Sequence, residues 1–127
     1  MLGDVIAMET KNLQNLVLKH FDFLRQDYGF EHEKKSNSYK KNDFTIEVEH
    51  ENGELNIIFK ETKGKELFFV DIMTTLTGEE FLYPAHFSSW ILSMGDVDSR
   101  LAYDAKLMKE YCNLLFHEDL KILKLLA

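Results

Sequence analysis

The chain has 127 residues, 45% of them apolar, and a formal net charge of −7 at pH 7. This length and composition predict a single globular domain over residues 1–127 with a core of its own. One cysteine excludes an internal disulfide bond. The N-terminus lacks the pattern of a secretory signal peptide, and no apolar run approaches the roughly 18 residues of a membrane span. We therefore predict a cytoplasmic protein that makes no membrane contact.

The negative charge is concentrated in the middle of the chain. Residues 43–95 hold ten acidic and three basic residues, whereas residues 1–42 hold six and seven, and residues 96–127 hold six and five. Binding to a nucleic-acid backbone requires clustered Lys and Arg, so we predict no direct nucleic-acid partner. The acidic region favours either a basic protein partner or an ordinary solvated surface.

Apolar residues at spacings of three and four predict an amphipathic helix near the N-terminus. Thr10 is a candidate N-cap for a helix that begins near Lys11, and Gly29 is suited to end it. The predicted core-facing stripe consists of Leu13, Leu16, Val17, His20, Phe21, Leu24 and Tyr28.

The following segment has the pattern of a sheet edge. Residues 30–35 predict a charged edge strand, residues 36–38 a turn, and residues 39–42 the approach to a strand that begins at Asp43. A basic cluster, which we interpret as a solvated edge, consists of Lys34, Lys35, Lys40 and Lys41.

Residues 43–73 organise the predicted fold as two consecutive β-hairpins. Residues 44–50 alternate apolar and polar side chains, and residues 55–60 form the partner strand. Asn52-Gly53 between them is a strong signal for a two-residue turn. That turn sets Glu47 opposite Ile58, and it agrees with the register that the apolar pattern requires.

The second hairpin turns at Lys63-Gly64 into a strand over residues 66–72, and two registers are open. A two-residue loop sets Phe68 opposite Phe59, on the core face. A three-residue loop with Gly64 in the left-handed conformation pairs Lys60 with Glu66 and moves the whole strand to the other face. We prefer the first register because it leaves fewer apolar side chains in water.

Helices are predicted after residue 73. Thr74–Gly78 is interpreted as a loop, and Pro84 starts a helix that contains Trp90 and stops at Gly95. Asp96 or Asp98 is a candidate cap for a longer helix, whose core stripe is Leu101, Ala105, Met108, Cys112 and Leu115. A break at residues 117–119 precedes a short helix over residues 120–126. The predicted fold class is therefore α+β, with an antiparallel meander of 4–5 strands covered by an N-terminal helix and C-terminal helices.

The sequence contains none of the patterns that carry a named chemistry. No two histidines have the spacing of a helical zinc pair, there is no cysteine pair, and no glycine-rich phosphate loop is present. Glu47, Glu49 and Asp71 are carboxylates that could share a face, but no nucleophile–base pair accompanies them. We predict no metal site, no cofactor and no enzymatic activity.

The predicted working surface is the outer face of the sheet, around Glu47, Glu49, Ile58, Phe69 and Asp71. Apolar side chains ringed by carboxylates have the composition of a protein interface with a polar rim. The alternative is that a C-terminal helix covers Ile58 and Phe69.

The order of elements resembles that of small bacterial immunity proteins of polymorphic and contact-dependent toxin systems. The resemblance is carried by the opening helix, Tyr28-Gly29-Phe30, the charged turn with Ser38-Tyr39, the acidic Asn52-Gly53 hairpin and the closing helices. It covers most of the chain in plan and carries over no single functional position. It implies a compact acidic protein that binds and blocks one toxin, often a basic nuclease. We therefore predict a non-enzymatic protein-binding module. The alternative is a ligand-binding or catalytic domain with a pocket between the sheet and the Trp90 helix.

Overall fold

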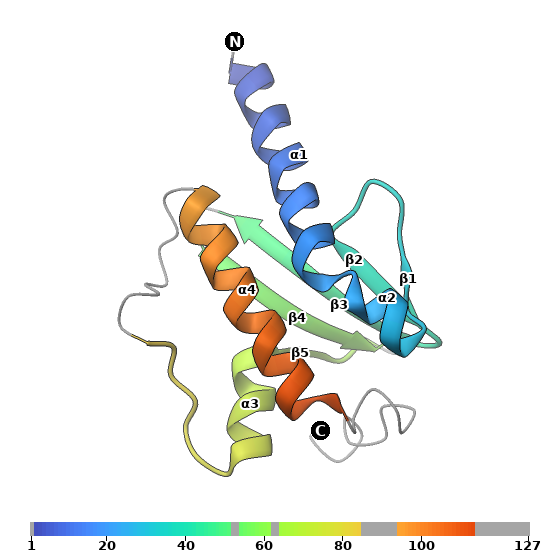
Figure 1. Cartoon of the computed structure of the whole chain (residues 1–127), viewed down its shortest axis with the longest axis vertical. Coiled ribbons are helices and arrows are strands. Elements are labelled where there is room, and N and C mark those ends of the chain that lie inside the picture. Colours follow the sequence, from blue (N-terminus) through green and yellow to red (C-terminus); the bar gives the residue numbers. More distant parts are fainter. Residues whose placement is uncertain (1, 52–53, 62–63, 85–93, 114–127) are drawn as a thin grey trace.

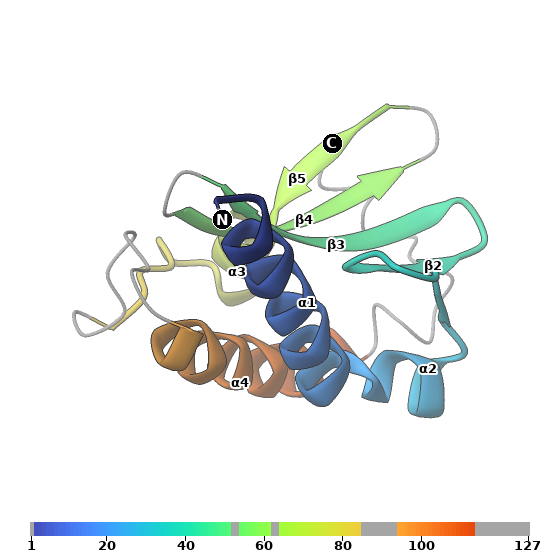
Figure 2. The same cartoon turned by 90° about the horizontal axis from the view of Figure 1, so that it is seen from above.

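The computed structural model describes residues 2–51, 54–61, 64–84 and 94–113 (Figure 1). Its elements in chain order are α1 (Leu2–Phe21), α2 (Phe23–Tyr28), β1 (Glu31–His32), β2 (Ser38–Lys41), β3 (Phe44–Glu51), β4 (Glu54–Glu61), β5 (Glu66–Phe68), α3 (Phe69–Thr77) and α4 (Met94–Tyr111). The strands form one five-stranded sheet in the order β1-β2-β3-β4-β5, with every neighbouring pair antiparallel. Figure 2 shows α1, α2 and α4 on one side of this sheet. The predicted α+β meander is confirmed.

The first hairpin has the register that its turn and its apolar alternation predict. Glu47 lies opposite Ile58 and Glu51 opposite Glu54, which leaves two residues for the turn. The buried side chains that face the helices from these two strands are Phe44, Ile46, Val48, Leu55, Ile57 and Phe59. This face supplies the sheet side of the core.

The second hairpin adopts the register that we did not prefer. Lys60 lies opposite Glu66 and Ile58 opposite Phe68. The Glu61 N–H donates to the Lys65 carbonyl at 2.8 Å, and Gly64 has a φ of +93°, so the loop spans three residues. The observed register sets Lys60 beside Glu66, whereas the other one opposes Glu61 to Glu66.

The strand predicted over residues 66–72 ends at Phe68, because the next segment is helix α3. The apolar residues Phe69, Ile72, Met73 and Leu76 follow the i, i+3, i+4, i+7 pattern of a helix face, and the first three are buried. The loop predicted at Thr74–Gly78 is also wrong. It is the last turn of α3, closed by Gly78 with a φ of +76° and its N–H bonded to the Thr74 carbonyl.

The N-terminal helix is longer than predicted and is interrupted once. Thr10 is not a cap, since α1 runs through it from Leu2. The interruption falls at Asp22, whose carboxylate accepts hydrogen bonds from the side chains of Arg25 and Gln26. Gly29, with a φ of +77°, ends α2 as predicted. The predicted stripe faces the core, with Leu13, Val17, Phe21 and Leu24 buried.

Helix α4 carries the predicted core stripe. Leu101, Ala105, Met108 and Cys112 are all buried. Gly95 does not stop a helix but lies in the first turn of α4. Residues 85–93, which include Trp90, lie outside the described residues, as do Leu115 and the predicted break and last helix.

Candidate functional site

The outer face of the sheet is the side opposite α1, α2 and α4 (Figure 2). Because successive strand residues point to opposite faces, the register fixes its members. From β3 these are Thr45, Glu47 and Glu49, from β4 Glu54, Asn56, Ile58 and Lys60, and from β5 Glu66 and Phe68. Toward the other edge of the sheet, the same register adds Ser38 and Lys40 of β2 and Glu31 of β1. Three of the five residues predicted for the working surface, Glu47, Glu49 and Ile58, are on this face.

Carboxylates dominate this part of the surface. Lys60 is the basic residue among the members from β3, β4 and β5, and it forms ion pairs with Glu47 and, at 3.8 Å, with Glu66. The hydrogen bond to Glu47 raises the pKa of Lys60, and the nearby charges of Glu66 and Glu49 act in the same direction. Lys60 therefore stays cationic and organises the acidic side chains around it, and the face keeps a negative balance.

The apolar part of the outer face is a pair of cross-strand neighbours. Ile58 is 6% exposed and lies outside the main core cluster, whereas Phe68 is 47% exposed. Ile58 has Glu47 on one side in the register and Phe68 on the other. Phe68 is therefore the side chain that a partner can reach, with Ile58 as the buried residue beside it.

Phe69 and Asp71, the other two residues predicted for the working surface, do not lie on the outer face of the sheet. Both lie in α3, and Phe69 is 1% exposed and stacks on Phe59 with ring centroids 5.9 Å apart. The reason is the register shift combined with the early end of β5. The helical spacing of Phe69, Ile72 and Met73 was the signal in the sequence that could have identified this. Phe68, which the preferred register placed in the core, is the exposed residue instead.

A second polar cluster connects the segment after α3 to α4 and the sheet. The Tyr83 hydroxyl donates to Asp104 at 2.7 Å, and the Arg100 guanidinium lies over the Tyr83 ring at 3.8 Å from its centroid. Arg100 also donates to the Leu55 carbonyl at 3.1 Å, and its Nε lies 3.4 Å from an Asp104 oxygen, within ion-pair distance. These contacts fix residues 81–84 against the helix and the strand.

Burial controls the protonation of this cluster. Asp104 is 0% exposed, and burial raises its pKa to about 6, although the charge of Arg100 acts in the opposite direction. Burial also raises the pKa of the Tyr83 hydroxyl, which keeps it protonated as a donor. A carboxyl group with such a pKa can act in acid–base chemistry, but full burial denies it a substrate from solution. We interpret the cluster as a structural anchor.

Metal-ligand clusters and pockets would be the other sites for chemistry in the described residues. Among the described residues, no group of three His, Cys, Asp or Glu side chains is arranged to hold a metal ion. The pocket proposed between the sheet and the Trp90 helix falls on residues outside the described part of the chain. An open groove instead lies between α1 and α4, lined by Lys19, His20, Ala102, Ala105, Lys106, Lys109 and Glu110.

Comparison with models of protein families, with curated protein sequences and with solved structures finds no match. Within the described ranges, none of the helices combines the length and the apolar character that crossing a bilayer requires.

Proposed function

We propose that this chain is a non-enzymatic protein-binding domain that binds a basic protein through the outer face of its sheet. The observation that supports the proposal most directly is Phe68, which is 47% exposed and lies on the edge strand β5 at the end of a cross-strand row, next to Ile58 and then Glu47. A half-exposed aromatic ring beside a buried aliphatic residue, surrounded by carboxylates, has the anatomy of an interface hot spot.

The charge of the face determines the kind of partner. Glu47, Glu49, Glu54 and Glu66 outnumber Lys60 on the members from β3 to β5. Such a field attracts a basic surface and repels nucleic acid. A basic bacterial toxin, which the resemblance in element order implies, is a partner of this chemistry. The proposal then includes a cytoplasmic location, where a protein with a single buried cysteine needs no disulfide.

The test is a matched pair of truncations at exposed apolar side chains. Phe68→Ala removes the exposed ring on the outer face, and Leu82→Ala removes a side chain that is 73% exposed in the segment after α3. The partner to use is a basic protein recovered from the native host by pull-down with the wild-type chain, and its affinity is measured by calorimetry. If this partner is a toxin, rescue of growth in cells that express it is the second measurement. Phe68→Ala is expected to weaken binding by about 2 kcal/mol or more, because hot-spot aromatics carry such energies.

Leu82→Ala is expected to bind like the wild type. Equal affinity of all three proteins would remove the outer face as the binding surface. Binding to nucleic acid alone, with no protein partner recovered from the native host, would contradict the proposed function as a whole.

A further inference from the structure

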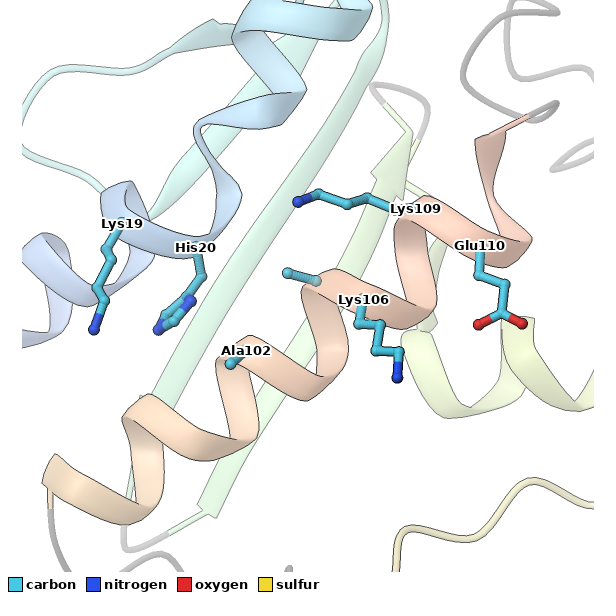
Figure 3. A pocket seen from close by; sticks show the side chains of 7 residues that line it. Lys19, His20, Ala102, Lys106, Lys109 and Glu110 are labelled. Carbon is cyan, nitrogen blue, oxygen red and sulfur yellow. The ribbon is translucent and has the colours of Figure 1, made fainter.

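The groove between α1 and α4 gathers positive charge on an acidic protein. It has a volume of about 430 Å³ and is open to solvent. Figure 3 shows Lys19 and His20 projecting from α1 on one side, and Lys106 and Lys109 projecting from α4 on the other. Ala102 and Ala105 are also in the lining, and their small side chains leave the space between the helices unfilled. The groove lies in the helix layer, so it is separate from the outer sheet face.

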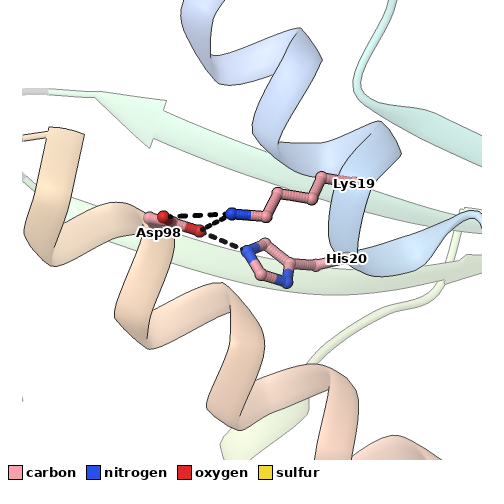
Figure 4. Close-up of polar contacts among 3 residues, drawn as sticks. All are labelled: Lys19, His20 and Asp98. Carbon is pink, nitrogen blue, oxygen red and sulfur yellow. Dashed lines mark hydrogen bonds and ion pairs between the residues drawn. The ribbon is translucent and has the colours of Figure 1, made fainter.

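The cations of the groove are only partly neutralised. Lys19 and His20 share one carboxylate, that of Asp98 at the start of α4, with Lys19 Nζ 3.2 Å from its Oδ1 (Figure 4). The pKa of Asp98 is lowered mainly by the hydrogen bond with His20, and to a smaller extent by the hydrogen bond from Lys19. Lys109 lies over the Phe23 ring at 4.7 Å from its centroid. Within the described residues, Lys106 makes no ion pair. The lining therefore contains three lysines and a histidine, with one carboxylate, that of Glu110, in the lining and another, that of Asp98, bound to Lys19 and His20.

The positions of these two carboxylates limit what the groove can hold. Asp98 and Glu110 are twelve residues apart on α4, which corresponds to about 18 Å along a helix. A nucleic-acid backbone or a long acidic segment requires a continuous basic track and would pass one of the carboxylates. A compact anion fits between them. Lining aromatic rings on which a base could stack are absent from the described residues of the groove.

We propose that the α1–α4 groove is a binding site for a compact multivalent phosphate, held by Lys19, Lys106 and Lys109 with His20. Lysine binds phosphate as a mobile point charge and needs no fixed bidentate geometry, so side chains from two helices can converge on one anion. A multivalent phosphate engages several ammonium groups at once and can replace Asp98 as the partner of Lys19 and His20. An exposed ion pair between a lysine and a singly charged anion contributes little binding free energy. We therefore expect an anion that carries several charges.

The experiment uses the full chain and sodium tripolyphosphate as the probe, in a phosphate-free buffer at about 0.15 M salt, where weak surface attraction is largely screened. Calorimetry measures the affinity, and amide NMR shifts locate the site. The groove variant is Lys106→Gln/Lys109→Gln. The matched control is Lys34→Gln/Lys40→Gln, which removes the same charge from exposed lysines of the basic cluster near the sheet edge.

The proposal predicts that tripolyphosphate shifts amide NMR signals of α1 and α4 alone. The groove variant is expected to bind tripolyphosphate about tenfold more weakly or worse, because each hydrogen bond to a charged group contributes to the binding free energy. The control variant is expected to bind like the wild type. Equal weakening in both variants, shifts spread over all lysines, or no binding would overturn the proposal. The location of the shifts in the wild-type protein does not depend on how well the variants fold.

A second arm identifies the source of the phosphate. Phosphatidylcholine vesicles with and without phosphatidylinositol bisphosphate are sedimented with the protein. Sedimentation with the bisphosphate vesicles alone, competed by tripolyphosphate, would assign the groove to a lipid headgroup. Tripolyphosphate binding without sedimentation would assign it to a free phosphate.

Discussion

Phe68 and Phe69 are adjacent in the sequence, and the structure gives them opposite environments. Phe69 is 1% exposed and stacks on Phe59 at 5.9 Å between ring centroids, whereas Phe68 is 47% exposed. Replacing each by alanine in turn therefore tests both the register of β5 and the early start of α3. We expect Phe69→Ala to be strongly destabilising and Phe68→Ala to be mild.

The expected magnitudes follow from the buried area. A buried phenylalanine removes about 150–250 Å² from water, and at about 25 cal/mol per Å² this gives an upper bound of about 4–6 kcal/mol. Alanine keeps part of that burial, so a loss of about 3–5 kcal/mol is expected for Phe69→Ala. About half of the Phe68 side chain is already exposed, which reduces the expected loss for Phe68→Ala to about 1–2 kcal/mol.

The assay is urea unfolding followed by circular dichroism at one temperature and pH. Because small domains are stable by only about 5–15 kcal/mol, Phe69→Leu is included as a milder variant in case Phe69→Ala does not fold. Phe69→Leu should still lose more stability than Phe68→Leu. A larger loss at position 68 would indicate that the strand continues through residue 69 in the other register, and equal losses would contradict the different environments of the two side chains.

Three further predictions concern the core, the buried carboxyl group and the outer face. Val48→Asp should cost about 3 kcal/mol or more in the same unfolding assay, because it buries an unpaired charge in the sheet face that the helices cover; a smaller loss would mean that this face is accessible to water. Burial raises the pKa of Asp104 from 3.8 to about 6, so its contribution to stability is fully present below pH 3.8 and is lost as the pH rises through about 6. Relative to Asp104→Asn, the wild type should therefore gain about 1.4 kcal/mol between about pH 7.5 and pH 5, and a constant or opposite difference in urea unfolding would contradict the assignment. The on-rate for a basic partner should fall clearly between about 0.01 M and 0.15 M salt, where the Debye length shrinks from about 30 Å to about 8 Å, and a rate independent of salt in stopped-flow measurements would count against attraction by the acidic face.

The sequence predicts those parts of the fold in which two independent signals agree. The first hairpin combines the turn preference of Asn52-Gly53 with strict alternation over residues 44–50, and its observed register is the predicted one. The stripe from Leu101 to Cys112, which follows α4 and ends one residue beyond it, repeats at helical spacing over several turns, and its members are buried. In both places an alternative arrangement would expose apolar side chains, so local pattern and burial select the same structure.

The second hairpin could not be predicted in the same way because its signals conflict. The segment from Glu66 to Ile72 is apolar enough for a buried strand, yet Phe69, Ile72, Met73 and Leu76 also fit one helix face. A shift of one residue at Gly64 exchanges the two faces of β5, so the identity of the exposed aromatic residue depends on a single loop residue. Burial of Phe69 through α3 resolves the conflict, and this requires the tertiary contact with Phe59. Glu47, Glu49 and Ile58 therefore lie on the outer face of the sheet, whereas Phe69 and Asp71 lie in α3.

The net charge of the chain conceals two surfaces of opposite sign. Summation along the sequence assigns residues 96–127 a slight excess of acid, and this gives no indication of a basic site. The fold produces one by setting Lys19 and His20 of α1 beside Lys106 and Lys109 of α4, residues that are far apart in the chain. The acidic outer face and this groove lie on opposite sides of the sheet, so an anion bound in the groove does not cover Phe68. If both proposals hold, Lys106→Gln/Lys109→Gln, which alters the groove without adding a polyanion that would itself bind a basic partner, will keep the wild-type affinity for that partner, whereas a clear loss of affinity would mean that one of the assigned surfaces is wrong.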